Sequence, residues 1–266
     1  MNSRTFVFSA VAVCLAIAVL SPPEKSSAEP ILKPRKYSGP IPERYFSISI
    51  GAFGGATNEE MWDFLDRQID DVFRDETETE DFGTALSLDA CYAVKVHPQF
   101  AVRTRAGLSF LGADGKGVID PNLPAPADTL LLRFDRGFDV LLFSIDATGL
   151  FFFQDASVKE FQTYIGGGFS LYIPYATYSE DRTDYDTGKS YSSYETSEWS
   201  FEPGVHAVLG FLYHFKPTMA FNMEGRVQMA QSKFEIVYPT TSGTQDLSFD
   251  VDYTGFILSV GVAKFF

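Results

Sequence analysis

The sequence has 266 residues, a formal net charge of −14, 15% aromatic residues and two cysteines. A chain this acidic lacks the basic surface that binds nucleic acid, and 45% hydrophobic residues exclude a disordered chain. The body of the chain has no run of about 20 apolar residues, so a transmembrane helix is disfavoured, whereas the alternating strands of a membrane β-barrel would escape that criterion.

The N-terminal segment has the features of a secretory signal. Arg4 precedes an apolar run from Phe6 to Leu20, which is too short to span a membrane comfortably. Ser26 and Ala28 supply the small side chains that a signal peptidase reads. We predict a signal peptide over residues 1–28 and a mature chain with a net charge of −15.

Cleavage would also remove Cys14 and leave Cys91 as the single cysteine, so no intramolecular disulfide is expected. The following residues, 29–43, include four prolines and several basic residues. This composition predicts an extended, Pro-rich periplasmic tail ahead of the folded domain.

From Tyr45 onward the apolar residues alternate with small or polar ones, which is the period of a β-strand and not of a helix. Phase slips near Phe143 and near Gln231 interrupt the alternation, and the first suggests a β-bulge. Eight such segments follow one another, at residues 44–53, 82–96, 99–111, 137–153, 161–178, 199–215, 218–238 and 251–266.

The two faces of these segments differ in bulk. One face carries Phe, Tyr, Trp, Leu and Val, and the other carries mostly Gly, Ser and Ala with charges of both signs. The interior of an eight-stranded barrel is only wide enough for side chains, and a face rich in Phe would overfill it. We therefore predict that the apolar face points outward into lipid.

The connections between segments alternate in length. Short ones lie at residues 97–98, 154–160 and 216–217. Long loops at one end and tight turns at the other are typical of outer-membrane barrels. The four long ones are expected at residues 54–81, 112–136, 179–198 and 239–250.

One helix is expected, in the first long loop. Thr57 and Glu60 have the spacing of a capping box, and Met61, Leu65 and Ile69 then follow on one face. This loop has 11 acidic and 2 basic residues, so it carries most of the negative charge of the chain.

The last strand carries a family resemblance. Ser259, Gly261 and the final Phe266 match the C-terminal signal that the barrel-assembly machinery reads, although Lys264 stands where that signal has an aromatic residue and the aromatic is displaced to Phe265. With the strand pattern, the mature chain resembles small bacterial outer-membrane β-barrels of the OmpA/OmpW type. The resemblance implies an all-β fold, an eight-stranded antiparallel up-and-down transmembrane β-barrel over residues 44–266. The short helix expected from Thr57 and Glu60 would lie in its first extracellular loop.

The inward face is expected to hold a polar network. Isolated charges in a narrow protein interior are costly, so these residues should pair with one another and plug the barrel. A gated ion path is the alternative. The network residues are Asp89, Lys95, Arg103, Arg105, Glu202, His206, Glu224, Arg226 and Gln228.

No catalytic, cofactor or metal site is predicted. Membrane-embedded enzymes that modify lipid A share this architecture and use a Ser/His/acid set, but His97, His206 and His214 have no His-x-Ser context. The segment 183–190 ends like a phosphate-binding loop, yet it lacks the first glycine and the flanking strand and helix, so it is interpreted as a turn.

The sequence thus predicts a non-enzymatic outer-membrane protein with a structural or surface-interaction role. Acidic loops would be extracellular, and the turns and the N-terminal tail would be periplasmic. Expected partners are outer-membrane lipid and lipopolysaccharide, the assembly machinery and divalent cations at the loops. A narrow channel for small or apolar molecules is one alternative, which an apolar lumen or a lateral opening would favour. A lipid A-modifying enzyme is the other.

Overall fold

A computed structural model describes residues 44–57, 78–79, 82–119, 132–153, 161–184, 186–240 and 243–266. The signal peptide and the Pro-rich tail predicted for residues 1–43 lie outside these ranges, as does the expected loop helix after Thr57. Within the described ranges, no helix is long and apolar enough to cross a membrane.

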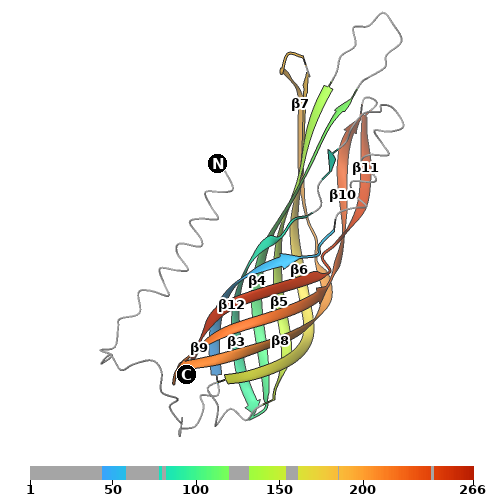
Figure 1. Cartoon of the computed structure of the whole chain (residues 1–266). Helices are drawn as coiled ribbons and strands as arrows, with labels where there is room; N and C mark the ends of the chain where they lie inside the picture. The colour runs from blue at the N-terminus through green and yellow to red at the C-terminus, as the bar shows by residue number, and fades with distance from the viewer. Residues whose placement is uncertain are drawn as a thin grey trace, which may run out of the picture. The chain divides into compact units, whose positions relative to one another are not determined.

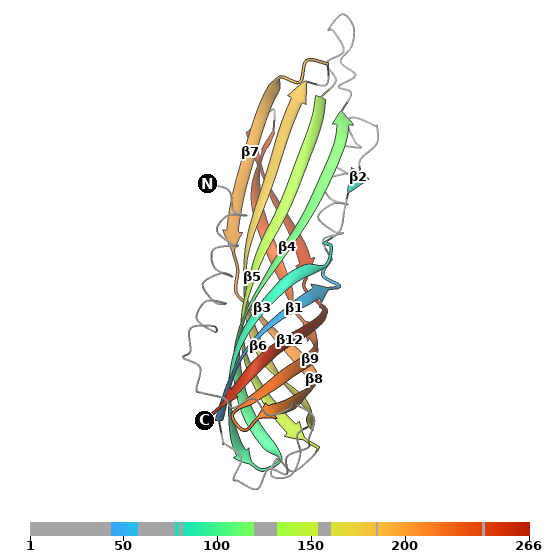
Figure 2. The same cartoon turned by 60° about the vertical axis from the view of Figure 1, so that its left-hand side comes forward.

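Eight antiparallel strands close into a barrel, which confirms the predicted fold (Figures 1 and 2). Each strand pairs with its neighbours in the chain order of the barrel, and β12 closes on β1 from Tyr45↔Phe265 to Gly54↔Phe256. Closure leaves no strand edge facing lipid, as a hydrocarbon environment requires. The barrel strands are β1 (Arg44–Gly54), β3 (Ala85–His97), β4 (Phe100–Ile119), β5 (Leu132–Phe152), β6 (Phe161–Asp184), β8 (Glu202–Lys216), β9 (Met219–Met229) and β12 (Gly255–Phe265).

The alternation in the sequence becomes two surfaces of the barrel wall. On β1, Ile48 and Ile50 are 43% and 46% exposed, whereas Ser47 and Ser49 are 1% and 4% exposed. The same alternation holds in the other barrel strands, so the bulky apolar face is the outer one. An apolar outer wall around a closed barrel is the arrangement that a bilayer selects.

Three of the expected long loops are wrong in part, because strands continue into them. β4, β5 and β6 remain paired as far as Ile119↔Leu132 and Leu132↔Asp184, beyond the barrel wall (Figure 2). Backbone pairing lets polar segments stay ordered outside the lipid. The additional strands are β2 (Glu78–Thr79) on β4, β7 (Ser190–Trp199) on β6, and the hairpin of β10 (Gln231–Thr240) with β11 (Gly243–Asp252).

We call the end of the barrel with these extensions the loop end. The opposite end, where β3–β4 and β8–β9 join through His97–Phe100 and Lys216–Met219, is the turn end. The register shifts of the barrel ladders lie at these two turns, between Lys95 and His97 and between His214 and Lys216.

The bulge predicted in the fourth segment is wrong. β5 pairs with both β4 and β6 without a register shift, and Phe138, Val140 and Leu142 point into the barrel. The sequence misleads there because the inner face changes from polar to apolar along the strand. Near Gln231 the chain does not change phase. β9 ends at Met229 and β10 begins at Gln231, and the alternation of buried and exposed residues continues across Ala230 between them.

Candidate functional site

The closed barrel encloses an interior, and the side chains that point into it form layers. Along β5 from the turn end, the inward residues are Phe152 and Leu150, then Thr148, Asp146 and Ser144, then apolar residues that begin at Leu142. The other strands contribute to the same three levels. We call these levels the turn-end layer, the ion-pair belt and the loop-end layer.

The belt contains a buried arginine–glutamate pair. Both terminal nitrogens of Arg103 on β4 donate to the carboxylate of Glu224 on β9, one of them at 3.0 Å. The hydroxyl of Tyr164 donates to the same carboxylate at 2.7 Å. Arg103 is 1% and Glu224 is 5% exposed, so each charge is compensated by the other and is hardly stabilised by solvent.

A second set of ion pairs is centred on Asp146 of β5. Its Oδ2 lies 2.5 Å from Arg226 Nη1 and 3.3 Å from Arg105 Nε. Arg105 Nη2 also lies 2.9 Å from Oδ1 of Asp89. Together with the Arg103–Glu224 pair, three arginines therefore face three carboxylates in the belt. The formal charge of this buried layer is balanced.

Hydroxyl and amide groups extend the belt. The ring nitrogens of His206 each lie 2.8 Å from a hydroxyl, Nε2 from Thr148 and Nδ1 from Ser170. Arg226 donates to Ser170 at 3.0 Å, and the amide of Gln228 accepts a hydrogen bond from Tyr172 at 3.2 Å. Buried polar groups without such partners would be costly.

Two of the predicted network residues lie outside the belt. Lys95 is near the turn end, with Nζ 5.1 Å from the centre of the Phe152 ring. Glu202 is the first residue of β8, toward the loop end, and is partly exposed. The structure thus brings Asp89, Arg103, Arg105, His206, Glu224, Arg226 and Gln228 together and leaves Lys95 and Glu202 apart.

Asp146 is absent from the polar network that the sequence predicts, although it balances the charge of the belt. The phase slip predicted near Phe143 left the inner face of the fourth segment unassigned, so the predicted network includes no residue of that segment. A signal was present in the alternation of Ser144, Asp146 and Thr148 within an otherwise apolar stretch. In the preceding strand, Arg103 and Arg105 are the inward residues. Placing Thr148 and Asp146 opposite them puts both on the inner face of the fourth segment.

Mostly apolar side chains line the lumen on the turn-end side of the belt. Phe265 packs against Tyr45 with ring centres 5.0 Å apart and against His214 at 4.7 Å. Phe152 lies 5.5 Å from the ring of Tyr164. Other members of this turn-end layer are Ala93, Ala101, Leu150, Val208, Leu212, Ala220 and Ala263.

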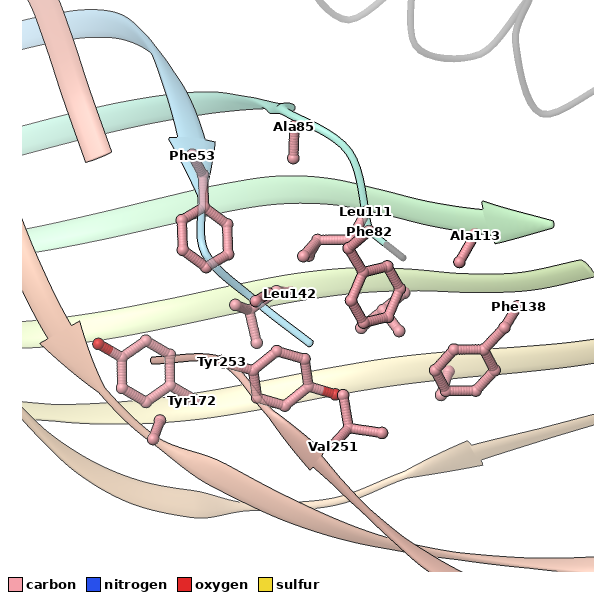
Figure 3. Packing of buried hydrophobic residues seen from close by; sticks show 14 of the residues in the cluster. Phe53, Phe82, Ala85, Leu111, Ala113, Phe138, Leu142, Tyr172, Val251 and Tyr253 are labelled. Carbon is pink, nitrogen blue, oxygen red and sulfur yellow. The ribbon is translucent and has the colours of Figure 1, made fainter. Parts of the chain in front are cut away.

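The loop-end layer is larger and aromatic (Figure 3). Phe138 makes ring contacts with Phe82 at 5.8 Å, with Phe249 at 5.7 Å and with Phe234 at 6.0 Å. Tyr253 is fully buried in the same layer. The expectation that the interior holds mainly small and polar residues is therefore wrong at both ends of the lumen, where Phe and Tyr fill it.

A further ion cluster lies beyond the apolar layer, in the extension of β5 and β6. The carboxylate of Glu180 is 3.1 Å from Arg136 Nε and 2.6 Å from Arg182 Nε, and it accepts a hydrogen bond from Tyr178 at 2.7 Å. Burial alone would raise the pKa of Glu180, but the two guanidinium groups and the hydroxyl outweigh burial and lower that pKa below its ordinary value.

The wall of the extension contains a seam between β7 and β10. Among the described residues, β7 pairs only with β6, and β10 pairs only with β11. Hydrogen bonds that involve side chains cross the seam instead. The backbone N–H of Glu235 donates to the Glu198 carboxylate at 2.7 Å, and the hydroxyl oxygens of Ser200 and Ser232 lie 2.5 Å apart. The two strands are thus held by polar contacts without a backbone ladder.

The residues of the expected assembly signal lie on both faces of β12. Phe266 and Lys264 are exposed on the outer face, while Ser259 is buried inside. Phe265 points into the turn-end layer, so it does not replace the outward aromatic that Lys264 displaces. Gly261 has a packing reason of its own, since a Cβ there would lie 2.2 Å from the carbonyl oxygen of Ile48.

The geometry of His206 differs from that of a catalytic base. A Ser/His/acid set requires a carboxylate that orients the imidazole, whereas both ring nitrogens of His206 face hydroxyl groups. His206 and its two hydroxyl partners are buried inside the barrel. Within the described ranges, no group of three or more His, Cys, Asp or Glu side chains could hold a metal ion.

Comparison with known proteins gives similarity of fold. No protein-family model and no curated protein matches the sequence. The outer membrane protein OprG from Pseudomonas aeruginosa aligns with a TM-score of 0.54 and 14% identity, over 86% of this chain and 98% of OprG. Neisserial surface protein A aligns with a TM-score of 0.40 and 12% identity, over 84% and 96%.

A major outer membrane protein from Thermus thermophilus aligns with a TM-score of 0.42 and 15% identity, over 84% of this chain and 99% of that protein. The chain has the fold of the small eight-stranded outer-membrane β-barrels, and this fold indicates an outer-membrane location. A fold shared at such identities carries no activity with it.

Proposed function

We propose that the protein is a non-enzymatic outer-membrane barrel with a closed lumen and a structural or surface-interaction role. The observation that carries this proposal is the charge-balanced ion-pair belt, which lies between two apolar layers. A conducting pore needs a continuous polar path, and the aromatic side chains on both sides of the belt oppose one.

The proposed orientation places the loop end outside the cell and the turn end in the periplasm. Acidic loops would then face lipopolysaccharide, whose phosphates divalent cations can bridge to carboxylates, or they would face a basic partner. Ser259, Gly261 and Phe266 of the last strand are the residues we propose for recognition by the assembly machinery. Proteolysis of intact cells tests the orientation, since cleavage in the loop-end segments is expected and their complete protection would contradict it.

Conductance across a planar bilayer tests the closed lumen. The refolded full chain is expected to produce no steady, large conductance, because apolar and aromatic side chains lie in the lumen on both sides of the ion-pair belt. A steady conductance in most insertions would overturn the proposal. Mass spectrometry of lipid A from cells with and without the gene tests the non-enzymatic part, for which no mass change is expected.

A second candidate function is transport of apolar molecules, which the loop-end layer favours. The aromatic interior around Phe138 and Tyr253 is compatible with apolar solutes, and the seam beside β7 lacks a backbone ladder that would have to break for lateral passage. Uptake of an apolar fluorescent dye by cells that overproduce the protein discriminates the two. Faster uptake without ionic conductance would support transport over a purely structural role.

A further inference from the structure

Three basic residues lie close together on the outside of the turn end. Lys264 of β12 and Lys216 of β8 both have Met219 of β9 as a register partner. Two strand spacings therefore separate their backbones, or about 10 Å. Arg44 of β1 adjoins them, because its carbonyl accepts a hydrogen bond from the N–H of Phe266 at 3.0 Å. All three basic side chains are exposed.

Within the part of the chain that the structure describes, no acidic side chain lies along the turn-end part of the strands that surround these cations. Residues 44–50, 90–106, 212–223 and 258–266, which form this side of the turn end, contain no Asp or Glu. The loop end differs, since exposed cations there alternate with carboxylates, as in the Arg133–Asp135 pair at 3.5 Å. The turn-end cations therefore present a local positive potential to whatever lies beside the barrel.

The depth of the three cations is set by their aromatic neighbours. Phe46, the register partner of Lys264, is outward and 39% exposed, and Phe215, next to Lys216, is 47% exposed. Phe266 is 62% exposed, and Lys264 Nζ lies 5.8 Å from the centre of its ring. Aromatic belts mark the boundary between hydrocarbon and headgroups, so the three cations lie at headgroup depth.

We propose that Arg44, Lys216 and Lys264 form a binding patch for the phosphate of an anionic phospholipid. Arginine and lysine donate charge-assisted hydrogen bonds to phosphate oxygens, and the adjacent aromatic rings contact the acyl chains. The patch also gives Lys264 a role at the position where the assembly signal has an aromatic residue. In the proposed orientation, the turn end meets the inner, phospholipid leaflet of the outer membrane.

Native mass spectrometry of the refolded full chain in detergent, with equal amounts of phosphatidylglycerol and phosphatidylethanolamine, tests this patch. The wild type is expected to retain phosphatidylglycerol preferentially, by roughly fivefold for each cation that engages the headgroup. Arg44→Gln/Lys216→Gln/Lys264→Gln is expected to lose that preference. The matched control, Lys116→Gln/Arg133→Gln/Lys233→Gln, removes the same three charges at the loop end and should keep it.

Equal retention of the two lipids by the wild type would overturn the proposal, and so would an unchanged preference in the turn-end variant. Displacement of phosphatidylglycerol by an equimolar amount of inorganic phosphate would also contradict it, because the site would then bind the free anion as well as it binds the lipid. Heat-modifiable migration on gels checks that each variant is folded. The single variant Lys264→Gln, with a smaller expected loss, serves if the triple variant does not fold. The lipid preference is independent of whether the lumen conducts.

Discussion

The ion-pair belt and the loop-end layer both fill the lumen of the barrel, but with side chains of opposite chemical character. The belt contains long charged side chains, whose burial is tolerable only because each arginine faces a carboxylate, as Arg103 faces Glu224. The loop-end layer contains aromatic rings such as Phe138, which need only shape and contact. The belt should therefore be sensitive to the loss of a single charge, and the apolar layer to the loss of volume.

The largest effect is expected for Asp146→Asn. This change leaves Arg105 and Arg226 buried without their shared carboxylate, and breaking a buried ion pair from one side typically costs about 3–5 kcal/mol. Urea unfolding of the barrel in lipid vesicles, followed by tryptophan fluorescence, measures the loss.

The control for that change is Asp135→Asn on the same strand. Its pair with Arg133 is exposed, with 41% and 52% of the two side chains accessible, and exposed pairs contribute about 0–1 kcal/mol. Equal losses in the two variants would mean that the belt is no more charge-sensitive than the surface.

A smaller loss, about 3 kcal/mol, is expected for Phe138→Ala, because it removes the ring that contacts Phe82, Phe234 and Phe249. Phe138→Leu keeps most of the volume and should cost less than about 1.5 kcal/mol. The same unfolding assay applies to both. If alanine were tolerated without loss, Phe138 would not be packed inside the barrel.

The smallest effect is a pH dependence of the extension beyond the barrel. The ion pairs of Glu180 with Arg136 and Arg182 lower the pKa of Glu180 below its ordinary value of 4.5. These two ion pairs therefore stabilise the folded extension at pH values above 4.5. This contribution is lost as the pH falls through the lowered pKa.

Hydrogen exchange of the β5 and β6 amides, measured between neutral and acidic pH, should therefore reveal faster opening of the extension at low pH. Glu180→Gln removes the titrating group and should flatten this dependence. A dependence that persists in Glu180→Gln would assign it to other carboxylates.

The sequence was sufficient for the closed barrel, because a period of two survives in every strand, as in Phe46, Ile48 and Ile50 of β1. It was also sufficient for most of the belt, since a charged residue on an otherwise small-residue face is conspicuous. It was insufficient for the loop-end layer. The residue type of an apolar side chain such as Leu142 does not reveal whether it faces the lumen or the lipid. The orientation follows only from the pairing of β5 with β4 and β6.

The strand extensions escaped prediction for a related reason. Outside the membrane neither face of a strand has to be apolar, so the segment 179–184 of β6 consists of polar residues and its sequence predicts a loop. Pairing of the backbone with β5 and β7 orders it all the same.

Closure of the lumen is most directly tested at Cys91. Its side chain is 4% exposed, and its register partners are Ser47 and Arg105, so it lies at the level of the belt. Small charged methanethiosulfonate reagents of both signs, applied to the folded barrel in vesicles, are expected to leave the Cys91 thiol unmodified until urea unfolds the protein. Modification of Cys91 in the folded barrel at a rate near that of the unfolded chain would contradict a sealed lumen.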